Sequence, residues 1–377
     1  MSRMHRRSWF AVLVPVAALA LAPLATASPA GASGAVIHVA TTGTDGPTCG
    51  SFGDPCRTIG QGVANAGPGF SVRVANGTYN EMVTVTKELK LTASHAAINA
   101  TGLNNGILVQ GSAASGSVVK GFTVENAIGE GILASQVDGV VIASNVVVNN
   151  DQGALGTPNT YPECQGQGQV PGDCGEGIHL QTTTNSKLLG NDVTHNVGGI
   201  LVSDDLGPTF GNLIAGNNAS DNAEDCGITL PSHAPGAGVY DNVVTGNTVN
   251  NNGGAGVLIA ASAPGTMAYN NTISHNSISG NGLPGVTIHA HAPDQSVDGN
   301  KIVDNVIGNN AIFGDSDAHD RKSTGIVVFS AVVPVNGTVI QRNTISDDHY
   351  GLFLAGAVSQ ALVRDNNYVG VAVPVRS

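Results

Sequence analysis

The chain has 377 residues, of which 41% are hydrophobic and only 11% are charged; 51 are glycine, and the formal net charge is −12. The first 27 residues hold three arginines and no acid, so the remainder carries 12 basic and 27 acidic side chains and a net charge of −15. Because nucleic-acid binding depends on lysine and arginine contacts to phosphate, this composition argues against nucleic acid as a partner.

The first 27 residues have the pattern of a secretory signal peptide. A basic start with Arg6 and Arg7 precedes an apolar run from Trp9 to Leu24, and Ala-Thr-Ala at 25–27 is a small-x-small cleavage pattern. The rest of the sequence contains no apolar run of membrane-spanning length. We therefore expect residues 1–27 to be removed and the mature protein to be secreted to the extracellular space without a membrane span.

Five cysteines in an exported chain permit disulfides. Cys49 and Cys56 bracket one short Gly/Pro-containing stretch, and Cys164 and Cys174 bracket another. Two local bridges are the simplest pairing, although the sequence leaves other connectivities open. Cys226 is left over, and we interpret it as a core residue rather than a reactive thiol, because unpaired cysteine is among the most buried residue types.

Residues 28–100 are expected to form an N-terminal cap and the first strands. The pattern over 58–66 predicts a short helix with Thr58 as N-cap and with Ile59 and Val63 on its apolar face. Such a helix would cover the open end of a stack of coils. Alternating apolar residues then predict strands at 71–74, 82–85 and 89–92.

Residues 101–377 contain an internal repeat. Four segments share the template Asn-x-apolar-x-x-Asn-x-apolar-x-x-Asn, and their starts lie 30, 29 and 29 residues apart. They begin at Asn212, Asn242, Asn271 and Asn300. A glycine that opens an aliphatic strand follows each copy, as in Gly227-Ile228. A β-propeller would need a period near ~40 residues, so we set that fold aside.

Each repeat provides three short strands, none of which can bury its apolar face alone. Stacking identical coils about 4.8 Å apart aligns the inward residues into continuous columns. Asparagine tolerates left-handed backbone at the corners, and its amide can bond the amides one coil above and below. The sequence therefore predicts an all-β fold, a single-stranded right-handed parallel β-helix of about nine or ten coils with a short N-terminal capping helix.

The opening and the repeats resemble the pectate-lyase-like superfamily of parallel β-helix proteins. The resemblance rests on Arg57-Thr58-Ile59, Pro68-Gly69 and the segment Gly77-Thr78-Tyr79-Asn80-Glu81. The coils are similar to repeats shared by polysaccharide lyases, mannuronan epimerases and the periplasmic copper-accessory protein NosD. The resemblance covers residues 35 to about 365 and implies the fold. It transfers no catalytic residue, because the catalytic motifs of the lyases, epimerases and polygalacturonases are missing from this sequence.

Two long inserts mark the corners where we expect chemistry, because insertions are where a solenoid carries function. One insert, 151–175, precedes the strand that Gly177 opens, and the other, 311–324, precedes the strand that Gly325 opens. By coil count they lie five steps apart, roughly 24 Å along the axis. We expect them to wall a groove across the sheet between them.

The turns along this predicted groove carry acids and histidines in register. Asp205, His233, Ser262 and His291 fall at equivalent positions of consecutive coils. Carboxylate and imidazole groups suit proton transfer or metal binding, and a repeated solvated turn is the alternative interpretation. We take Asp205 and His233 as candidate catalytic residues. The expected substrate-binding residues are His179, Gln181, Asp204, His289 and His291.

The second insert holds the densest ionisable cluster of the chain. Asp315, Asp317 and Asp320 are spaced as oxygen ligands for a hard cation, which makes calcium the candidate cofactor. Arg321 or Lys322 would be the base that a lyase needs beside a carboxylate. An exposed charged loop is the alternative interpretation.

Three functions remain open from the sequence. The favoured one is an extracellular protein that acts on polysaccharide, as a lyase or epimerase, with the paired inserts as its support. The second is a non-catalytic scaffold or glycan-binding module, which the missing catalytic signature favours. The third is a NosD-like metal-accessory role, which the histidine content favours. A monomer is expected, because a capped solenoid leaves few unpaired strand edges.

Overall fold

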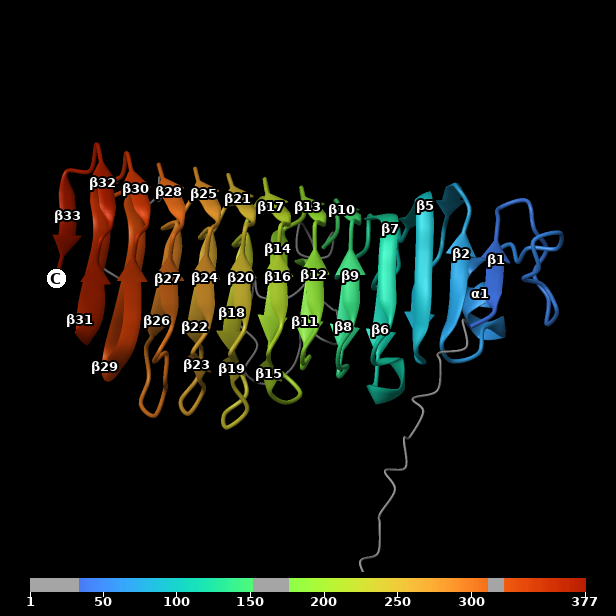
Figure 1. Cartoon of the computed structure of the whole chain (residues 1–377), viewed down its shortest axis with the longest axis horizontal. Coiled ribbons are helices and arrows are strands. Elements are labelled where there is room, and N and C mark those ends of the chain that lie inside the picture. The colour runs from blue at the N-terminus through green and yellow to red at the C-terminus, as the bar shows by residue number, and fades with distance from the viewer. Residues whose placement is uncertain (1–33, 152–175, 311–321) are drawn as a thin grey trace, which may run out of the picture. The chain divides into compact units, whose positions relative to one another are not determined.

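The computed structural model describes residues 34–151, 176–310 and 322–377, and these belong to one compact unit, Ser33–Ser377. The strands pair in parallel and form three stacks, each of which runs along the long axis of the molecule (Figure 1). This confirms the predicted parallel β-helix. The predicted signal peptide and the pair Cys164 and Cys174 lie outside the described residues.

Four long strands each belong to two stacks: β5 and β7 to the first and second, and β29 and β31 to the first and third. The first stack contains β1 (Val36–Val39), β2 (Phe70–Val74), β5 (Leu89–Asn99), β7 (Val118–Glu125), β9 (Val141–Ala143), β12 (Lys187–Leu189), β16 (Leu213–Ala215), β20 (Val243–Thr245), β24 (Thr272–Ser274), β27 (Lys301–Val303), β29 (Thr324–Gln341) and β31 (Tyr350–Arg364). The second stack also uses β5 and β7 and adds β3 (Gly77–Tyr79), β10 (Val146–Val148), β13 (Asp192–Thr194), β17 (Asn218–Ser220), β21 (Thr248–Asn250), β25 (Ser277–Ser279), β28 (Val306–Gly308), β30 (Thr344–Ser346) and β32 (Asn367–Val369). The third stack also uses β29 and β31 and adds β4 (Val83–Val85), β6 (Ile107–Gln110), β8 (Ile132–Ser135), β11 (Glu176–Gln181), β14 (Gly198–Ser203), β18 (Ile228–Ser232), β22 (Val257–Ala261), β26 (Val286–Ala290) and β33 (Val373–Arg376).

The core consists of aliphatic columns that run along the solenoid. Ile214, Val244, Ile273 and Ile302 are direct neighbours on successive coils and are fully buried, as the repeat predicted. Burial of such side chains stabilises each coil by about 2 kcal/mol per residue. Because a coil contacts only its neighbours, the stability of the fold grows coil by coil.

Asparagine ladders fix the corners between the stacks. Asn217 shows the pattern: its amide nitrogen donates to Leu188 O at 3.0 Å and to Asn247 Oδ1 at 3.0 Å. The left-handed backbone, however, belongs to the residue before each ladder asparagine, such as Gly216 before Asn217. The ladder residue needs extended geometry to reach both neighbouring coils, so the preceding residue makes the turn.

The same rule explains two histidines. His195 and His275 each have positive φ and stand directly before a ladder asparagine. They are corner residues of the coils. Neither therefore needs a functional explanation.

A helix and a disulfide build the N-terminal cap. α1 (Ile59–Asn65) begins after the N-cap Thr58, whose hydroxyl accepts from Gln61 N at 3.2 Å. The Glu81 carboxylate accepts from the first two helical amides, Ile59 N and Gly60 N, both at 2.8 Å. Cys49 and Cys56 form a disulfide beside this helix, and a short 3₁₀ turn, η1 (Ser112–Ala114), follows β6.

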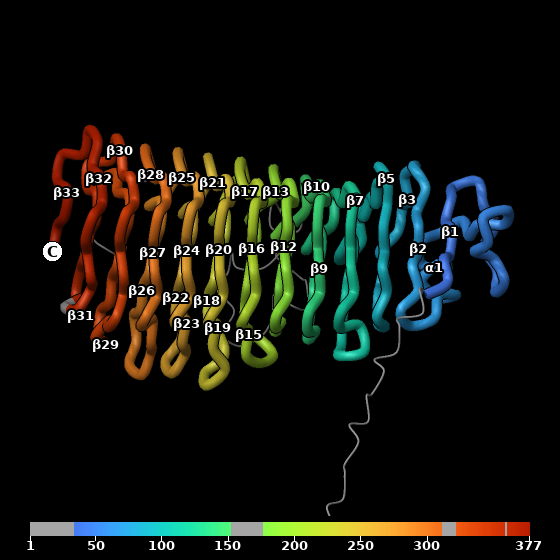
Figure 2. Tube along the Cα trace, viewed as in Figure 1, coloured from blue at the N-terminus to red at the C-terminus, as the bar shows by residue number. Residues whose placement is uncertain are grey.

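The turns after the third stack are long enough to pair with one another. β15 (Thr209–Phe210), β19 (Val239–Tyr240) and β23 (Ala268–Tyr269) form a small parallel sheet, and Figure 2 shows the corresponding loops side by side. Phe210, Tyr240 and Tyr269 stack face to face with ring centroids 4.9–5.0 Å apart. Among the described residues, no helix is long and apolar enough to cross a membrane.

Candidate functional site

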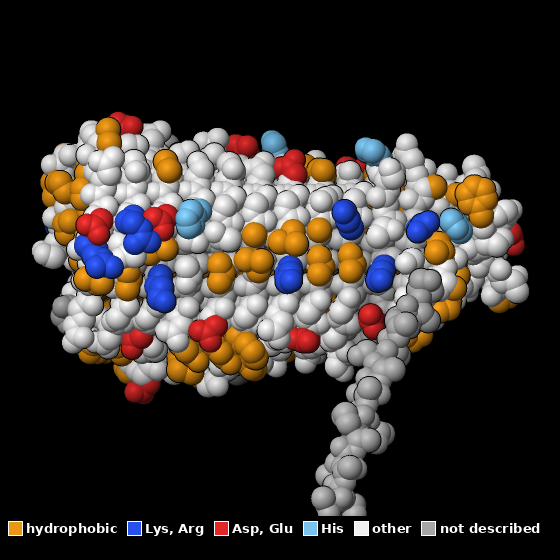
Figure 3. All heavy atoms as spheres, in the orientation of Figure 1, with side chains coloured by type: hydrophobic (Ala, Val, Ile, Leu, Met, Phe, Trp, Pro, Cys, Tyr) orange, Lys and Arg blue, Asp and Glu red, His pale blue; other side chains and the backbone are white. Residues whose placement is uncertain are grey.

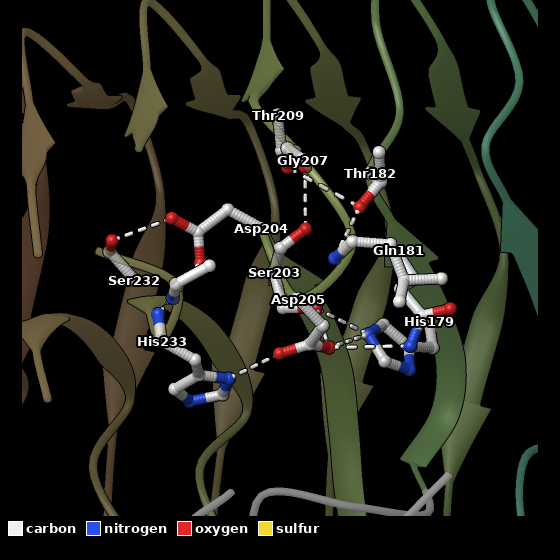
Figure 4. Close-up of polar contacts among 12 residues, drawn as sticks. His179, Gln181, Thr182, Ser203, Asp204, Asp205, Gly207, Thr209, Ser232 and His233 are labelled. Atoms are coloured by element: carbon white, nitrogen blue, oxygen red, sulfur yellow. Dashed lines mark hydrogen bonds and ion pairs between the residues drawn. The ribbon is translucent and has the colours of Figure 1, made fainter. Parts of the chain in front are cut away.

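The candidate site lies on the outer face of the third stack. In β11, Ile178 and Leu180 point into the core, so the alternation of a strand turns His179 and Gln181 outward. Ser203 ends β14 one coil further on, and these three polar side chains are at most 5% exposed. The turns after β14 and β18 add the remaining residues of the site (Figure 4).

Asp205 is the centre of the site and joins two histidines. Its Oδ1 lies 2.7 Å from His233 Nδ1, and its Oδ2 accepts from Ser203 Oγ at 2.6 Å and from Gln181 Nε2 at 3.3 Å. His179 Nε2 is 3.9 Å from the same Oδ2. Figure 4 shows Asp205 between the two imidazole rings.

These contacts keep Asp205 ionised. Burial raises the pKa of its carboxyl group, but the hydrogen bond from His233, the charges of His179 and His233 and the Ser203 hydroxyl outweigh burial and bring the pKa below its usual value of 3.8. At neutral pH the site therefore presents a carboxylate that contacts His233 directly and is linked to His179 through the Ser203 hydroxyl.

His179 continues the network to a second carboxylate. Its Nε2 lies 2.8 Å from Ser203 Oγ, and its Nδ1 lies 2.9 Å from Glu130 Oε1. Glu130, His179, Ser203, Asp205 and His233 thus form one continuous chain of polar contacts across four coils. Such a chain can orient imidazole rings and relay protons.

Asp204 anchors the turn that carries His233. Its carboxylate is fully buried and accepts from Ser232 Oγ at 2.6 Å, from the backbone amides of His233 and Ala234 at 2.6 and 3.1 Å, and from Gly238 N at 2.7 Å. These four donors use the carboxylate fully. Asp204, expected from the sequence to bind substrate, thus positions His233, and any role in binding substrate remains a prediction.

Two glutamates of the site escaped the sequence analysis. Glu130 and Glu176 are 0% and 2% exposed, and one ligand atom from each lies within 4.8 Å of the other and of a His179 ring nitrogen. The available signal is the tetrapeptide Gly-Glu-Gly-Ile, which occurs at 129–132 and again at 175–178. Ile132 and Ile178 are direct neighbours in the third stack, so the two glutamates, each two residues before its isoleucine, lie on adjacent coils.

His289 and His291 form a separate group further along the stack. His291 Nε2 lies 2.9 Å from His289 Nδ1, and its ring packs beside Phe329 with centroids 5.4 Å apart. The pairings place β26 two coils beyond β18, so His291 is roughly 10 Å from His233 along the axis. This matches the predicted register, and the predicted role in substrate binding stays a prediction.

Lys322 is the predicted site residue of the second insert that the structure describes. Asp315, Asp317, Asp320 and Arg321, predicted as calcium ligands and base, lie outside the described residues. Lys322 is exposed, with Nζ 3.3 Å from His349 Nε2. Since β29 lies four coils beyond β14, Lys322 is roughly 19 Å from Asp205 along the axis.

Basic side chains gather on another face. Lys187 and Lys301 lie in register on the first stack, and Figure 3 shows lysine and arginine side chains spread along the face that this stack forms. Among the described residues, the basic side chains that contact Glu130 and Asp205 are the imidazoles of His179 and His233.

Comparisons with solved structures show the same fold. The Dettilon tailspike protein matches with a TM-score of 0.55 and 14% identity over 89% of this chain and 68% of that one. Pectate lyase Pel9A matches with a TM-score of 0.47 and 16% identity, covering 88% and 79% of the two chains. The mannuronan C-5 epimerase AlgE4 A-module of Azotobacter vinelandii matches with a TM-score of 0.39 and 15% identity, covering 81% and 88%. At 14% identity the likeness to the tailspike protein shows the fold alone.

The sequence comparisons give a family. A search among curated proteins found no match. The model of one protein family, however, matches residues 115–323, which is more than half of the chain and includes every residue of the candidate site from Glu130 to His233. The chain therefore belongs to the family described as periplasmic copper-binding protein (NosD).

Proposed function

We propose that the protein acts on a polysaccharide outside the cytoplasm by acid–base chemistry, with Asp205 and His233 as the central pair. The observation that carries the proposal is the 2.7 Å contact between His233 Nδ1 and Asp205 Oδ1. An ionised carboxylate on Nδ1 fixes the tautomer and orientation of the ring, as it does for histidines that act as general bases. The Asp204 turn holds the backbone of His233 in place.

The surroundings of this pair suit a linear polymer. The site lies on a sheet whose coil spacing of about 4.8 Å is close to the length of one sugar unit, so successive coils can meet successive sugars. His291 lies at the position equivalent to His233 two coils further on. A chain of sugars running parallel to the axis would pass both histidines.

The chemistry that fits this pair is proton removal next to the carboxyl group of a uronic acid. His233 takes the proton, and the electron pair left on carbon forms a double bond as the glycosidic oxygen departs and is protonated, which gives an unsaturated product. Return of a proton to the opposite face of the same carbon would instead give an epimer. We assign the base to His233 rather than to Lys322, because roughly 19 Å separates Lys322 from Asp205.

A release assay on the purified mature protein tests the proposal. A panel of acidic and neutral polysaccharides is incubated with calcium or with chelator, and unsaturated-product absorbance, reducing ends and proton NMR for epimers are followed. We expect product from one acidic polysaccharide, with at least a 100-fold loss of rate in His233→Gln and Asp205→Asn.

A corner histidine provides the control. His275→Asn leaves the site intact and keeps a residue that tolerates positive φ at that corner, so it should retain full activity. Binding without release would identify a glycan-binding module instead, and product formation that survives His233→Gln would remove His233 from the mechanism. Silence in both binding and release would overturn the proposal in favour of a scaffold.

A further inference from the structure

Glu130 and Glu176 place two carboxylates side by side in a buried environment. Glu176 begins β11, and Glu130 lies two residues before β8, its neighbour in the third stack. Ligand atoms of the two glutamates lie within 4.8 Å of each other. Two buried carboxylates at this separation repel each other and are poorly solvated. Such a pair therefore requires a shared proton or a cation. One observation favours a cation: Glu130 Oε2 is buried and accepts no hydrogen bond from the described residues.

The hydrogen bonds of His179 leave a place for a cation at Nδ1. Ser203 has a single hydroxyl proton, and its Oγ donates it to Asp205 Oδ2 at 2.6 Å. The 2.8 Å contact between His179 Nε2 and Ser203 Oγ then requires the ring to donate from Nε2. Nδ1 lies 2.9 Å from Glu130 Oε1, and a metal ion bound by both groups would take the place of the proton between them.

This arrangement is how proteins support metal-bound histidines. A ligating imidazole usually donates its other N–H to an oxygen acceptor that is itself hydrogen-bonded, which fixes the ring and raises its basicity as a ligand. Here the acceptor is Ser203 Oγ, and Asp205 lies behind it. The outer support of a metal site is thus already built around His179.

A glycine makes room for the second carboxylate. Gly198 lies opposite Glu176 on the next coil, and a Cβ at that position would come within 2.7 Å of Glu176 Cγ. The backbone of Gly198 does not need glycine for its own conformation, because its φ lies outside the left-handed region. Its lack of a side chain instead leaves space for Glu176.

We propose that Glu130, Glu176 and His179 bind one divalent transition-metal ion of intermediate hardness, Zn²⁺ or Mn²⁺. Two carboxylate oxygens and one imidazole nitrogen suit these ions. Calcium prefers six to eight oxygen ligands. The family is described as copper-binding, but copper in the Cu(I) state prefers sulfur ligands, and this cluster has none. Three protein ligands leave a fourth position for water or for a group of the substrate.

Metal titration of the chelator-treated, full-length exported protein tests this site, whether or not the protein acts on polysaccharide. Isothermal titration calorimetry with ZnCl₂, MnCl₂ and CaCl₂ should show one equivalent of Zn²⁺, bound at least 100-fold more tightly than Ca²⁺. Cu²⁺ binding would not distinguish this site from others on the protein, because Cu²⁺ binds most nitrogen and oxygen sites tightly. We expect Glu130→Gln and Glu176→Gln each to weaken Zn²⁺ binding at least 100-fold and Ser203→Ala to weaken it about tenfold.

The matched control is Glu125→Gln, a half-buried glutamate on β7 outside the cluster, and this variant should bind Zn²⁺ as the unmodified protein does. X-ray absorption on the zinc-loaded protein gives a readout that survives poor folding of a variant: one imidazole, oxygen ligands and no sulfur are expected. A sulfur shell would overturn the proposal, as would unchanged Zn²⁺ binding in Glu130→Gln. If Glu130→Gln stabilises a protein that binds no Zn²⁺, the two carboxylates share a proton instead.

Discussion

Asp348 occupies the place of an asparagine in the ladder between the second and third stacks, and its Oδ1 accepts from Asn310 N at 2.7 Å. The preceding steps of that ladder are asparagine to asparagine, from Asn222 to Asn252, Asn281 and Asn310. Burial raises the pKa of Asp348 to about 7, against the opposing effect of the hydrogen bonds from Asn310. Burial therefore favours the neutral form of Asp348, and a protonated aspartic acid has the shape of the asparagine that it replaces.

This substitution predicts a pH-dependent stability with a definite sign. The folded-state pKa is above the unfolded value of 3.8, so the contribution is fully present below pH 3.8 and is lost as pH rises through 7. We expect the free energy of unfolding to fall by about 2 kcal/mol between pH 5 and pH 8. Asp348→Asn should abolish most of this slope in urea titrations across that range.

The corner residue Asp241 offers the control for this experiment. It has positive φ and is exposed, so Asp241→Asn changes a charge without touching a ladder and should keep the pH dependence. An unchanged slope in Asp348→Asn would assign the pH dependence to another group.

The ladders themselves predict a contrast between two adjacent asparagines. Asn217 is 1% exposed; its amide donates to Leu188 and Asn247, and its Oδ1 accepts from Asn191 N and Nδ2, both at 2.9 Å. The side chain of Asn218 is less buried, and among the described contacts its amide nitrogen Nδ2 donates only to Asp192 Oδ1. Asn217→Ala leaves several buried groups unsatisfied and should cost about 3 kcal/mol, whereas Asn218→Ala should cost less than about 1 kcal/mol. Chemical denaturation of both variants measures the difference. Equal losses in the free energy of unfolding would mean that a ladder asparagine adds no more stability than its neighbour outside the ladder.

The repeat predicted the fold because its physical cause is local. A 29- or 30-residue period, apolar residues at fixed places and asparagines at corners determine the stacking, and Ile214, Val244, Ile273 and Ile302 align as expected. The contact between Asp205 and His233 followed from the same register. Where the period held, the sequence also placed side chains relative to one another.

The glutamate pair was missed where the period failed. Glu130 and Glu176 are neighbours in the third stack but 46 residues apart in sequence, because the first insert lies between them. Without a constant spacing, the sequence gives no register for Gly-Glu-Gly-Ile across the insert. The burial of these side chains could not be predicted from the sequence either, because outward positions of a sheet are usually solvated. His179, Glu130 and Glu176 are buried instead.

Gly198 predicts a way to damage the glutamate pair without removing a carboxylate. In Gly198→Ala the new methyl group would meet Glu176 Cγ at 2.7 Å, and the displaced carboxylate should lower Zn²⁺ affinity at least tenfold. Overpacking of this kind costs about 1–3 kcal/mol, so the variant should still fold. Gly53→Ala, with nothing within 4 Å of its Cβ, is the control. Calorimetric titration measures the Zn²⁺ affinity of both variants. Equal affinities would show that the space at Gly198 does not matter for the proposed metal site.

The Asp204 carboxylate predicts that the His233 turn can be loosened without changing any proposed proton-transfer group. It accepts from His233 N at 2.6 Å, Ser232 Oγ at 2.6 Å and Gly238 N at 2.7 Å. In Asp204→Asn one oxygen becomes a donor that faces donors, so a buried amide or hydroxyl loses its partner. We expect a loss of about 2 kcal/mol and faster hydrogen exchange at the amides of residues 233–238. Asp294→Asn, an exposed turn residue with positive φ, should change neither. Unaltered exchange at His233 in Asp204→Asn would show that the turn keeps its conformation without this carboxylate, and the role of Asp204 would then have to be sought in ligand binding.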